Sequence, residues 1–113
     1  MKRYEIYQAA LPVLQGSHVQ GGIRPVVIVS NDMANTYSPV ITVVPLTTRM
    51  TKSSLPTHVV LLTSGLSAES LALCEQIITL DKARIRHYIG YVSDYDDRAA
   101  LEHALSVQLG MAA

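Results

Sequence analysis

Arg24 stands at the start of an apolar stretch, in the segment QGGIRPVVIVSND at residues 20–32. Gly21 and Gly22 precede it, and a glycine lets a ligand approach the backbone closely. Pro25 follows it and keeps Arg24 extended. A guanidinium placed there can donate two parallel hydrogen bonds to a phosphate, and it stays charged at any useful pH. The segment therefore offers a phosphate-binding arginine, although an arginine that pairs with an acid at a strand edge would show the same pattern.

Other polar residues with chemical potential also stand where apolar stretches end or are interrupted. Thr47 and Thr48 end the apolar stretch at 40–48, where hydroxyl groups most often satisfy turn backbone. Glu75 and Gln76 interrupt an apolar region, and a buried pair of that kind must be partnered or lie at a functional site. These residues gain functional meaning only if the fold brings them to Arg24.

Composition restricts the classes of function. The chain has 113 residues, which predicts a single domain over 1–113, and its nine Lys and Arg balance nine Asp and Glu. The net charge therefore gives no long-range attraction to nucleic acid or to a membrane, and a polyanion would need a local patch. No run of eighteen apolar residues is present, so we expect a soluble, cytoplasmic protein.

Motifs for metal or cofactor binding are missing from the sequence. There is no Cys/His cluster with zinc spacing and no glycine-rich phosphate loop that opens a helix, and the four histidines are scattered. Cys74 lies in an apolar segment, which favours a buried, inert thiol over a nucleophile. We expect no metal and no cofactor.

The chain reads mostly as short strands, which we expect at residues 4–10, 25–30, 40–48, 57–63, 70–74, 75–80 and 87–93. Pro45 predicts a bulge or an edge position in the third strand. Single helical turns are expected within 31–39 and 81–85, and a long loop at 12–22.

The C-terminal segment changes to a helical period. Ser93 or Asp94 can cap its start, acids follow in the first turn, and Gly110 suits its end. A set of short strands with one terminal helix predicts a mainly β protein, a small, strongly bent sheet or barrel against which the helix packs.

The order of these motifs resembles that of the MazF/PemK family, the toxins of bacterial type II toxin–antitoxin systems. The resemblance rests on GS with QGGIRPVVIVSND, SPVITVVPLTTR, LPTHVVL, SLALCEQIITLDKARI and the terminal helix, and it covers essentially the whole chain. It implies an SH3-like barrel with helical additions, a homodimer and a cognate, MazE-like antitoxin. It also implies a sequence-specific, metal-independent ribonuclease that cuts single-stranded RNA.

The resemblance assigns roles to individual residues. Arg24 is implied as the main catalytic residue and Thr47 as the hydroxyl that holds a nonbridging phosphate oxygen. The ribose 2′-hydroxyl would attack the phosphate, giving a 2′,3′-cyclic phosphate and a 5′-hydroxyl. Dimerisation would concentrate cations, Lys52 among them, in one groove. The residues implied to bind RNA are Ser17, His18, Gln20, Asn31, Thr48, Arg49, Ser70, Glu75, Gln76 and Arg84.

This chain also departs from the family pattern. Tyr4 and Glu5 replace the usual glycine and aspartate, and His18 stands where an acid is common. The base preference and the general base therefore stay open, and His18 is either that base or only a loop residue in contact with RNA or solvent.

Two alternatives to a ribonuclease remain. A CcdB-like, gyrase-binding toxin would share the barrel but bind through its C-terminal helix, and the segment SVQLGMAA lacks the aromatic anchor expected of such a surface. An inactive family member is the second alternative.

Overall fold

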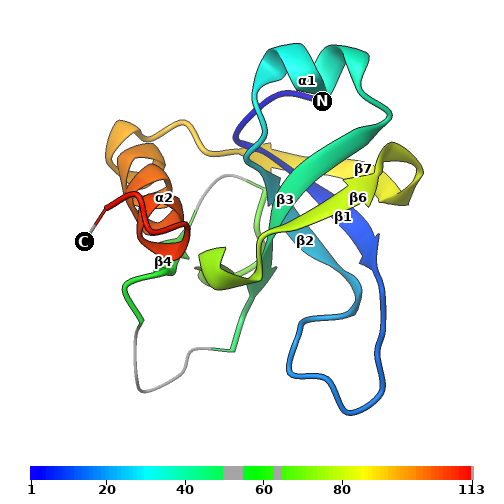
Figure 1. Cartoon of the computed structure of the whole chain (residues 1–113), viewed down its shortest axis with the longest axis horizontal. Helices are drawn as coiled ribbons and strands as arrows, with labels where there is room; N and C mark the ends of the chain where they lie inside the picture. The colour runs from blue at the N-terminus through cyan, green and yellow to red at the C-terminus, as the bar shows by residue number, and fades with distance from the viewer. Residues whose placement is uncertain (50–54, 63–64, 113) are drawn as a thin grey trace.

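The computed structural model describes residues 1–49, 55–62 and 65–112 and shows a bent sheet with one long helix against it (Figure 1). Lys52 and the end of the strand expected at 57–63 lie outside the described residues. The elements are β1 (Glu5–Leu11), β2 (Gly22–Ile28), α1 (Asp32–Tyr37), β3 (Val40–Thr47), β4 (His58–Leu61), β5 (Ser70–Leu73), η1 (Cys74–Gln76), β6 (Ile78–Asp81), η2 (Lys82–Arg84), β7 (Ile85–Tyr91) and α2 (Tyr95–Gln108).

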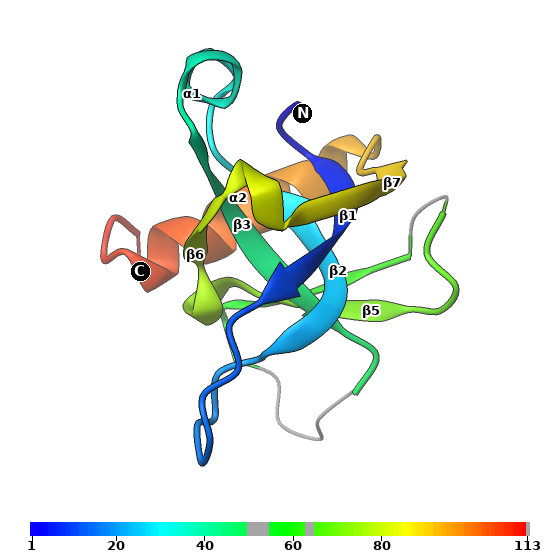
Figure 2. The same cartoon turned by 90° about the vertical axis from the view of Figure 1, so that its right-hand side faces the viewer.

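The strands form one antiparallel sheet in the order β4-β5-β3-β2-β1-β7, and β6 also pairs with β3. Figure 2 shows that the strands of this sheet are strongly twisted and bent. No pairing among the described residues joins the end strands β4 and β7, so the predicted barrel is an open one. The mainly β fold with a C-terminal helix is confirmed.

Pro45 lies in the central strand rather than in an edge strand. One side of β3 pairs with β6 over Val40–Val43 and with β5 over Leu46 and Thr47, so Pro45 falls in the gap between these two partners. Pro45 still pairs with Val26 on the β2 side. A proline has no N–H to donate to a ladder, and the change of partner strand accommodates that loss.

The strand expected at 75–80 is wrong in its first half. The chain makes a 3₁₀ turn at Cys74–Gln76 and only then extends as β6. The Ile77 N–H donates to the Cys74 carbonyl at 3.3 Å, which closes the turn. Glu75 and Gln76 thus lie in a turn rather than in a strand. Hydrogen bonds from distant residues to their side chains accompany this turn.

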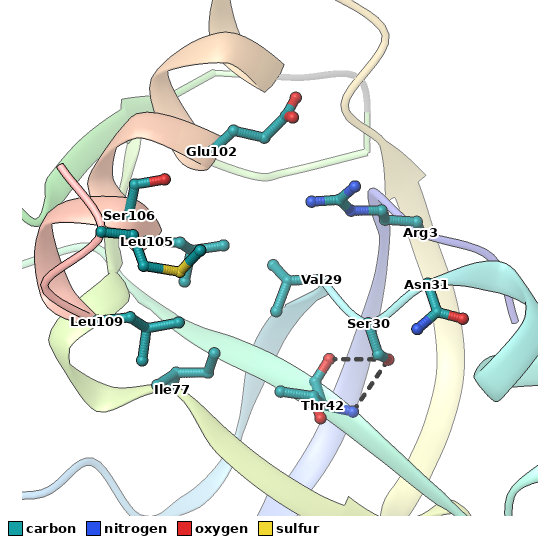
Figure 3. A pocket seen from close by; sticks show the side chains of 11 residues that line it. Arg3, Val29, Ser30, Asn31, Thr42, Ile77, Glu102, Leu105, Ser106 and Leu109 are labelled. Carbon is teal, nitrogen blue, oxygen red and sulfur yellow. Dashed lines mark hydrogen bonds between the residues drawn. The ribbon is translucent and has the colours of Figure 1, made fainter.

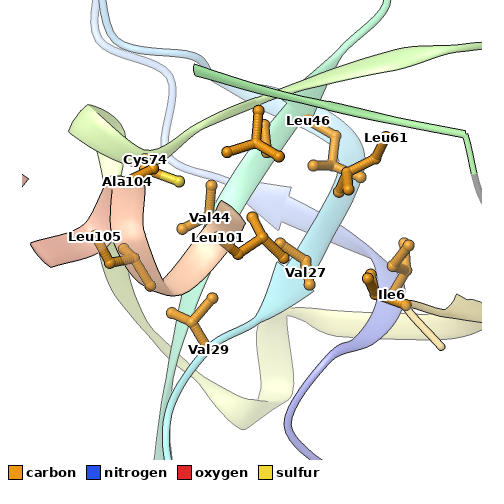
Figure 4. Packing of buried hydrophobic residues seen from close by; sticks show 13 residues of the cluster. Ile6, Val27, Val29, Val44, Leu46, Leu61, Cys74, Leu101, Ala104 and Leu105 are labelled. Carbon is orange, nitrogen blue, oxygen red and sulfur yellow. The ribbon is translucent and has the colours of Figure 1, made fainter. Parts of the chain in front are cut away.

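The main core lies between the sheet and α2 (Figure 4). Leu101, Ala104 and Leu105 of α2 are buried against strand residues such as Val27 and Val44. Asp94 caps the helix by accepting from the Asp96 N–H at 2.7 Å, as the sequence predicts. No helix within the described residues is long and apolar enough to cross a membrane.

Tyr4, which replaces a family glycine, has a positive φ of 73°. Its N–H donates to the Ile28 carbonyl at 2.8 Å, and its hydroxyl donates to Glu102 at 2.8 Å. The Arg3 and Arg98 guanidinium groups each lie 4.9 Å from the centre of its ring. These contacts offset the strain of a conformation that glycine adopts freely.

Gly65 brings the loop after β4 against β7. A Cβ atom at this position would lie 1.8 Å from the Ile89 carbonyl oxygen, and the backbone φ is +97°. Only a glycine allows this close approach. The contact connects the two ends of the open sheet where strand pairing does not.

Candidate functional site

Arg24 and Thr47 are brought together by the pairing of β2 with β3. Val26 lies opposite Pro45 and Val27 opposite Val44, so the same register continued by two residues places Arg24 opposite Thr47. Both residues line one pocket of about 300 Å³. The structure therefore joins the two residues that the family resemblance marks as catalytic, although they are far apart in the sequence.

The Arg24 pocket, as we call it, suits an anion. Its lining contains two guanidinium groups and three hydroxyl groups, and no carboxylate belongs to its described lining. The positive charges of these guanidinium groups, held at the strand ends, can bind a phosphate even though the whole chain has no net charge. The lining residues are Ile23, Arg24, Pro25, Leu46, Thr47, Thr48, Arg49 and Ser70.

The Arg24 guanidinium is held by one of its three nitrogens. Nε donates to the Gly21 carbonyl oxygen at 3.1 Å. Within the described part of the chain, its two terminal nitrogens have no hydrogen-bond partner. No acid among the described residues pairs with Arg24, so the structure gives no support to an arginine that serves only a strand-edge ion pair. A guanidinium fixed at Nε presents its terminal N–H groups as a fork that fits two phosphate oxygens.

The hydroxyl groups of the pocket differ in their freedom. Thr47 Oγ1 accepts a hydrogen bond from the Arg49 N–H at 3.2 Å, so its own proton can still be donated. Ser70 is buried and donates to the Ala68 carbonyl at 3.1 Å. Thr47 is thus the better placed hydroxyl for a phosphate oxygen, and Ser70 shapes the wall.

The partly buried side chain of Glu75 is bonded to Thr57 and lies next to His58, two residues that were not among the predicted site residues. Its carboxylate accepts from the Thr57 hydroxyl at 3.2 Å and lies 2.9 Å from His58 Nε2. His58 Nδ1 is buried with no hydrogen-bond partner among the described residues, and the His58 side chain is only 7% exposed. The motif PTH was visible in the sequence, but its partner was not.

The remaining residues predicted to bind RNA do not line the Arg24 pocket. Ser17 and His18 are exposed in the loop between β1 and β2, and Arg84 is exposed in η2. Gln20 and Gln76 are bonded to each other, since the Gln20 N–H donates to Gln76 Oε1 at 2.8 Å. Their contact with RNA stays a prediction.

Asn31 lies at a different pocket. Its side chain caps α1 by accepting from the Ala34 N–H at 2.8 Å. It lines a pocket of about 500 Å³ between α2 and the sheet, which Figure 3 shows with Arg3 and Glu102 on its rim and apolar residues such as Leu105 and Leu109 below. This larger pocket contains no other residue of the predicted RNA-binding set, and it lacks the paired donors of the Arg24 pocket.

Cys74 is fully buried, and burial raises the pKa of its thiol to about 12. We therefore expect no reaction of native protein with a thiol reagent at pH 8, and full reaction in urea. Because the thiol of the unfolded chain loses its proton near pH 9, the free energy of unfolding should fall as the pH rises from 9 toward 12. Chemical unfolding of the wild type and Cys74→Ala across this range should show a steeper decline in the wild type, and equal slopes would contradict the assignment.

Comparison with known proteins identifies relatives of this chain. The family model of PemK-like, MazF-like toxins of type II toxin–antitoxin systems matches residues 2–109. An endoribonuclease MazF from Staphylococcus saprophyticus is 43% identical over 113 residues, which cover 98% of this chain and 92% of the relative.

Solved structures show the same fold. A mycobacterial endoribonuclease in complex with its cognate antitoxin is 26% identical and superposes with a TM-score of 0.73, covering 98% of this chain and 96% of the other. MazF from Deinococcus radiodurans, at 23% identity, has a TM-score of 0.79 over 98% of this chain and 97% of its own. Because the family model and the Staphylococcus relative both match nearly the whole chain, the chain belongs to the PemK-like, MazF-like toxins of type II toxin–antitoxin systems.

Proposed function

We propose that this chain cleaves single-stranded RNA at a short recognition sequence, with the scissile phosphate in the Arg24 pocket. The observation that carries this proposal is that Arg24 and Thr47 line one pocket, with both terminal nitrogens of the guanidinium unpartnered among the described residues. The enzyme class, endoribonuclease, follows from family membership and from the 43% identical relative that bears this name.

The proposed chemistry uses the substrate's own nucleophile. The ribose 2′-hydroxyl attacks the phosphorus in line with the departing 5′-oxygen, and the products are a 2′,3′-cyclic phosphate and a 5′-hydroxyl. The terminal N–H groups of Arg24 donate to the nonbridging oxygens, on which negative charge grows in the transition state. Thr47 Oγ1 holds a nonbridging oxygen and so restricts the phosphate to the geometry that the attack requires.

The surroundings of the pocket supply the proposed RNA contacts. Arg49 lies in the pocket itself, and Ser17 and His18 lie on the loop that leads into β2. We propose that a homodimer forms a longer groove from two such surfaces and that a cognate antitoxin binds there. The mycobacterial relative is an endoribonuclease in complex with its cognate antitoxin, which supports the expectation of such a partner. RNA in the cytoplasm would then be the substrate.

A cleavage assay without free metal tests the proposal directly. The purified chain is incubated with a long RNA in excess EDTA, and the ends of the fragments are mapped. We expect cleavage in EDTA, because Arg24 and Thr47 supply the charge and the hydroxyl that the phosphate needs. We expect the cuts to fall at one short sequence. The upstream fragments should end in a 2′,3′-cyclic phosphate and the downstream ones should begin with a 5′-hydroxyl.

Two results would contradict the mechanism. Cleavage that returns only when a divalent ion is added would mean that the metal, rather than Arg24, stabilises the transition state. A 5′-phosphate on the downstream fragment would mean that water, rather than the 2′-hydroxyl, attacks. The described residues contain no group of three His, Cys, Asp or Glu that could hold such an ion.

A further inference from the structure

A short chain of hydrogen bonds connects Gln76 in η1 to the guanidinium of Arg24. Gln76 Oε1 accepts from the backbone N–H of Gln20 at 2.8 Å. The next residue, Gly21, accepts from Arg24 Nε through its carbonyl oxygen at 3.1 Å. One loop segment is thus bonded to η1 through Gln20 and to the arginine through Gly21.

The segment between these two bonds is closely packed. A Cβ atom on Gly21 would lie 2.8 Å from the Pro12 carbonyl oxygen and 3.2 Å from the side chain of Val13. The two sides of the loop at 12–22 therefore lie close together at Gly21, which restricts the movement of the backbone there. The position of Gln20 therefore also affects the position of the Gly21 carbonyl, which orients Arg24.

The hydrogen bond to Gln76 is the long-range one in this arrangement. Gln76 is 56 positions away in the sequence, whereas Gly21 is a near neighbour of Arg24. Most of the loop, from Pro12 to Val19, is exposed. Without the Gln76 bond, the end of this exposed loop would lose a connection to the body of the protein.

We propose that Gln76 is a positioning residue for catalysis, which acts through the loop at Gln20 and Gly21 to orient the Arg24 guanidinium. The proposal rests on the ribonuclease function above, and it differs from the role in base recognition that the family resemblance implies for Gln76. In base recognition the side-chain amide of Gln76 would donate to RNA, whereas in positioning its oxygen accepts from the protein's own backbone.

Two substitutions separate these roles. Gln76→Met keeps the length of the side chain but removes the acceptor, and we expect kcat to fall about tenfold with little change in KM, because small misplacements of a catalytic group cost up to about 100-fold. Gln76→Glu keeps an oxygen acceptor for the Gln20 N–H. Its kcat should stay within about twofold to threefold of the wild type. The added negative charge should affect KM instead, because it repels RNA.

The site of cleavage gives a second measurement. A residue that positions Arg24 leaves the recognised sequence unchanged, so the Gln76→Met variant should cut the same sites more slowly. In an Arg24→Ala background, Gln76→Met should cause no further loss, since there is no guanidinium left to orient. Gln108→Met, at an exposed position near the end of α2, is the matched control and should behave as the wild type.

Nuclear magnetic resonance tests the positioning without RNA. The Arg24 Nε–H signal should exchange slowly with water in the wild type and in Gln76→Glu, and faster in Gln76→Met. Circular dichroism of each variant confirms that the fold is retained.

Specific results overturn the proposal. An unchanged kcat and an unchanged Nε–H exchange rate in Gln76→Met would remove Gln76 from the positioning of Arg24. A changed recognition sequence in both Gln76 variants would assign it to base recognition instead. A wild-type chain that cuts no RNA would overturn the proposed function, and the exchange measurement would then still decide whether Gln76 holds Arg24.

Discussion

Arg24→Ala should lower the rate of RNA cleavage by at least about 100-fold, the scale of removing one preorganised electrostatic donor from a transition state. The guanidinium is the group of the Arg24 pocket whose terminal nitrogens have no partner among the described residues, and alanine leaves nothing in their place. The measurement is a single-turnover rate with saturating protein, which separates the chemical step from RNA binding.

Two controls make the result specific. Arg24→Lys keeps the charge but loses the planar fork, so it should recover only part of the lost rate. Arg86→Ala removes an exposed cation on β7 outside the pocket and should cleave at the wild-type rate. The thermal unfolding of all three variants should match that of the wild type. Full activity in Arg24→Ala would falsify the assignment of the site.

Leu101→Ala should destabilise the fold by about 3–5 kcal/mol, within the range for a large side chain removed from a close-packed core. Leu101 is 0% exposed and lies in the main core between α2 and the sheet (Figure 4). Its loss would leave a cavity that the strands cannot fill without bending. Urea unfolding followed by circular dichroism measures the change.

The matched control for this substitution is Leu14→Ala. Leu14 is 69% exposed in the loop between β1 and β2, so the same chemical change removes little buried surface. We expect it to alter the free energy of unfolding by less than about 0.5 kcal/mol. Equal effects of the two substitutions would mean that α2 does not contribute to the core.

The two residues that we propose as catalytic belong to conspicuous local motifs, so the sequence alone pointed to them. Arg24 follows two glycines and Thr47 ends an apolar strand, and the resemblance to a known family connected them. The pairing of β2 with β3 then explains why they meet, since it ends at Val26 and Pro45, two residues from Arg24 and Thr47, and both residues line one pocket.

The partners of polar side chains could not be predicted in the same way. Glu75 is bonded to Thr57 and His58, and Gln76 to the backbone of residue 20, and these contacts depend on the tertiary fold. Local patterns assigned residues 75–80 to a strand because they see apolar neighbours but not distant hydrogen bonds. Asn31 also caps α1, a contact that the sequence analysis did not predict, and its contact with RNA stays a prediction.

The C-terminal helix was predicted well because its signals are local. Asp94 at the start, the buried positions near Leu101 and the positive φ of Gly110 at the end all follow from short-range rules. The openness of the sheet was not visible in the sequence. Whether end strands pair depends on the shape that all strands adopt together, and here Gly65 makes a backbone contact with β7 in place of pairing.

The composition of the main core also has a consequence for synthesis on the ribosome. The core joins Ile6 of the first strand to Leu105 of the last helix, so its parts come from almost the whole length of the chain. Domains generally fold as units while the chain grows from its N-terminus. A nascent chain that has reached only β7 would have β2 and β3, and with them Arg24 and Thr47, but it would lack the helix that covers the sheet. We therefore expect the fold, and with it the Arg24 pocket, to be completed only after α2 has been made.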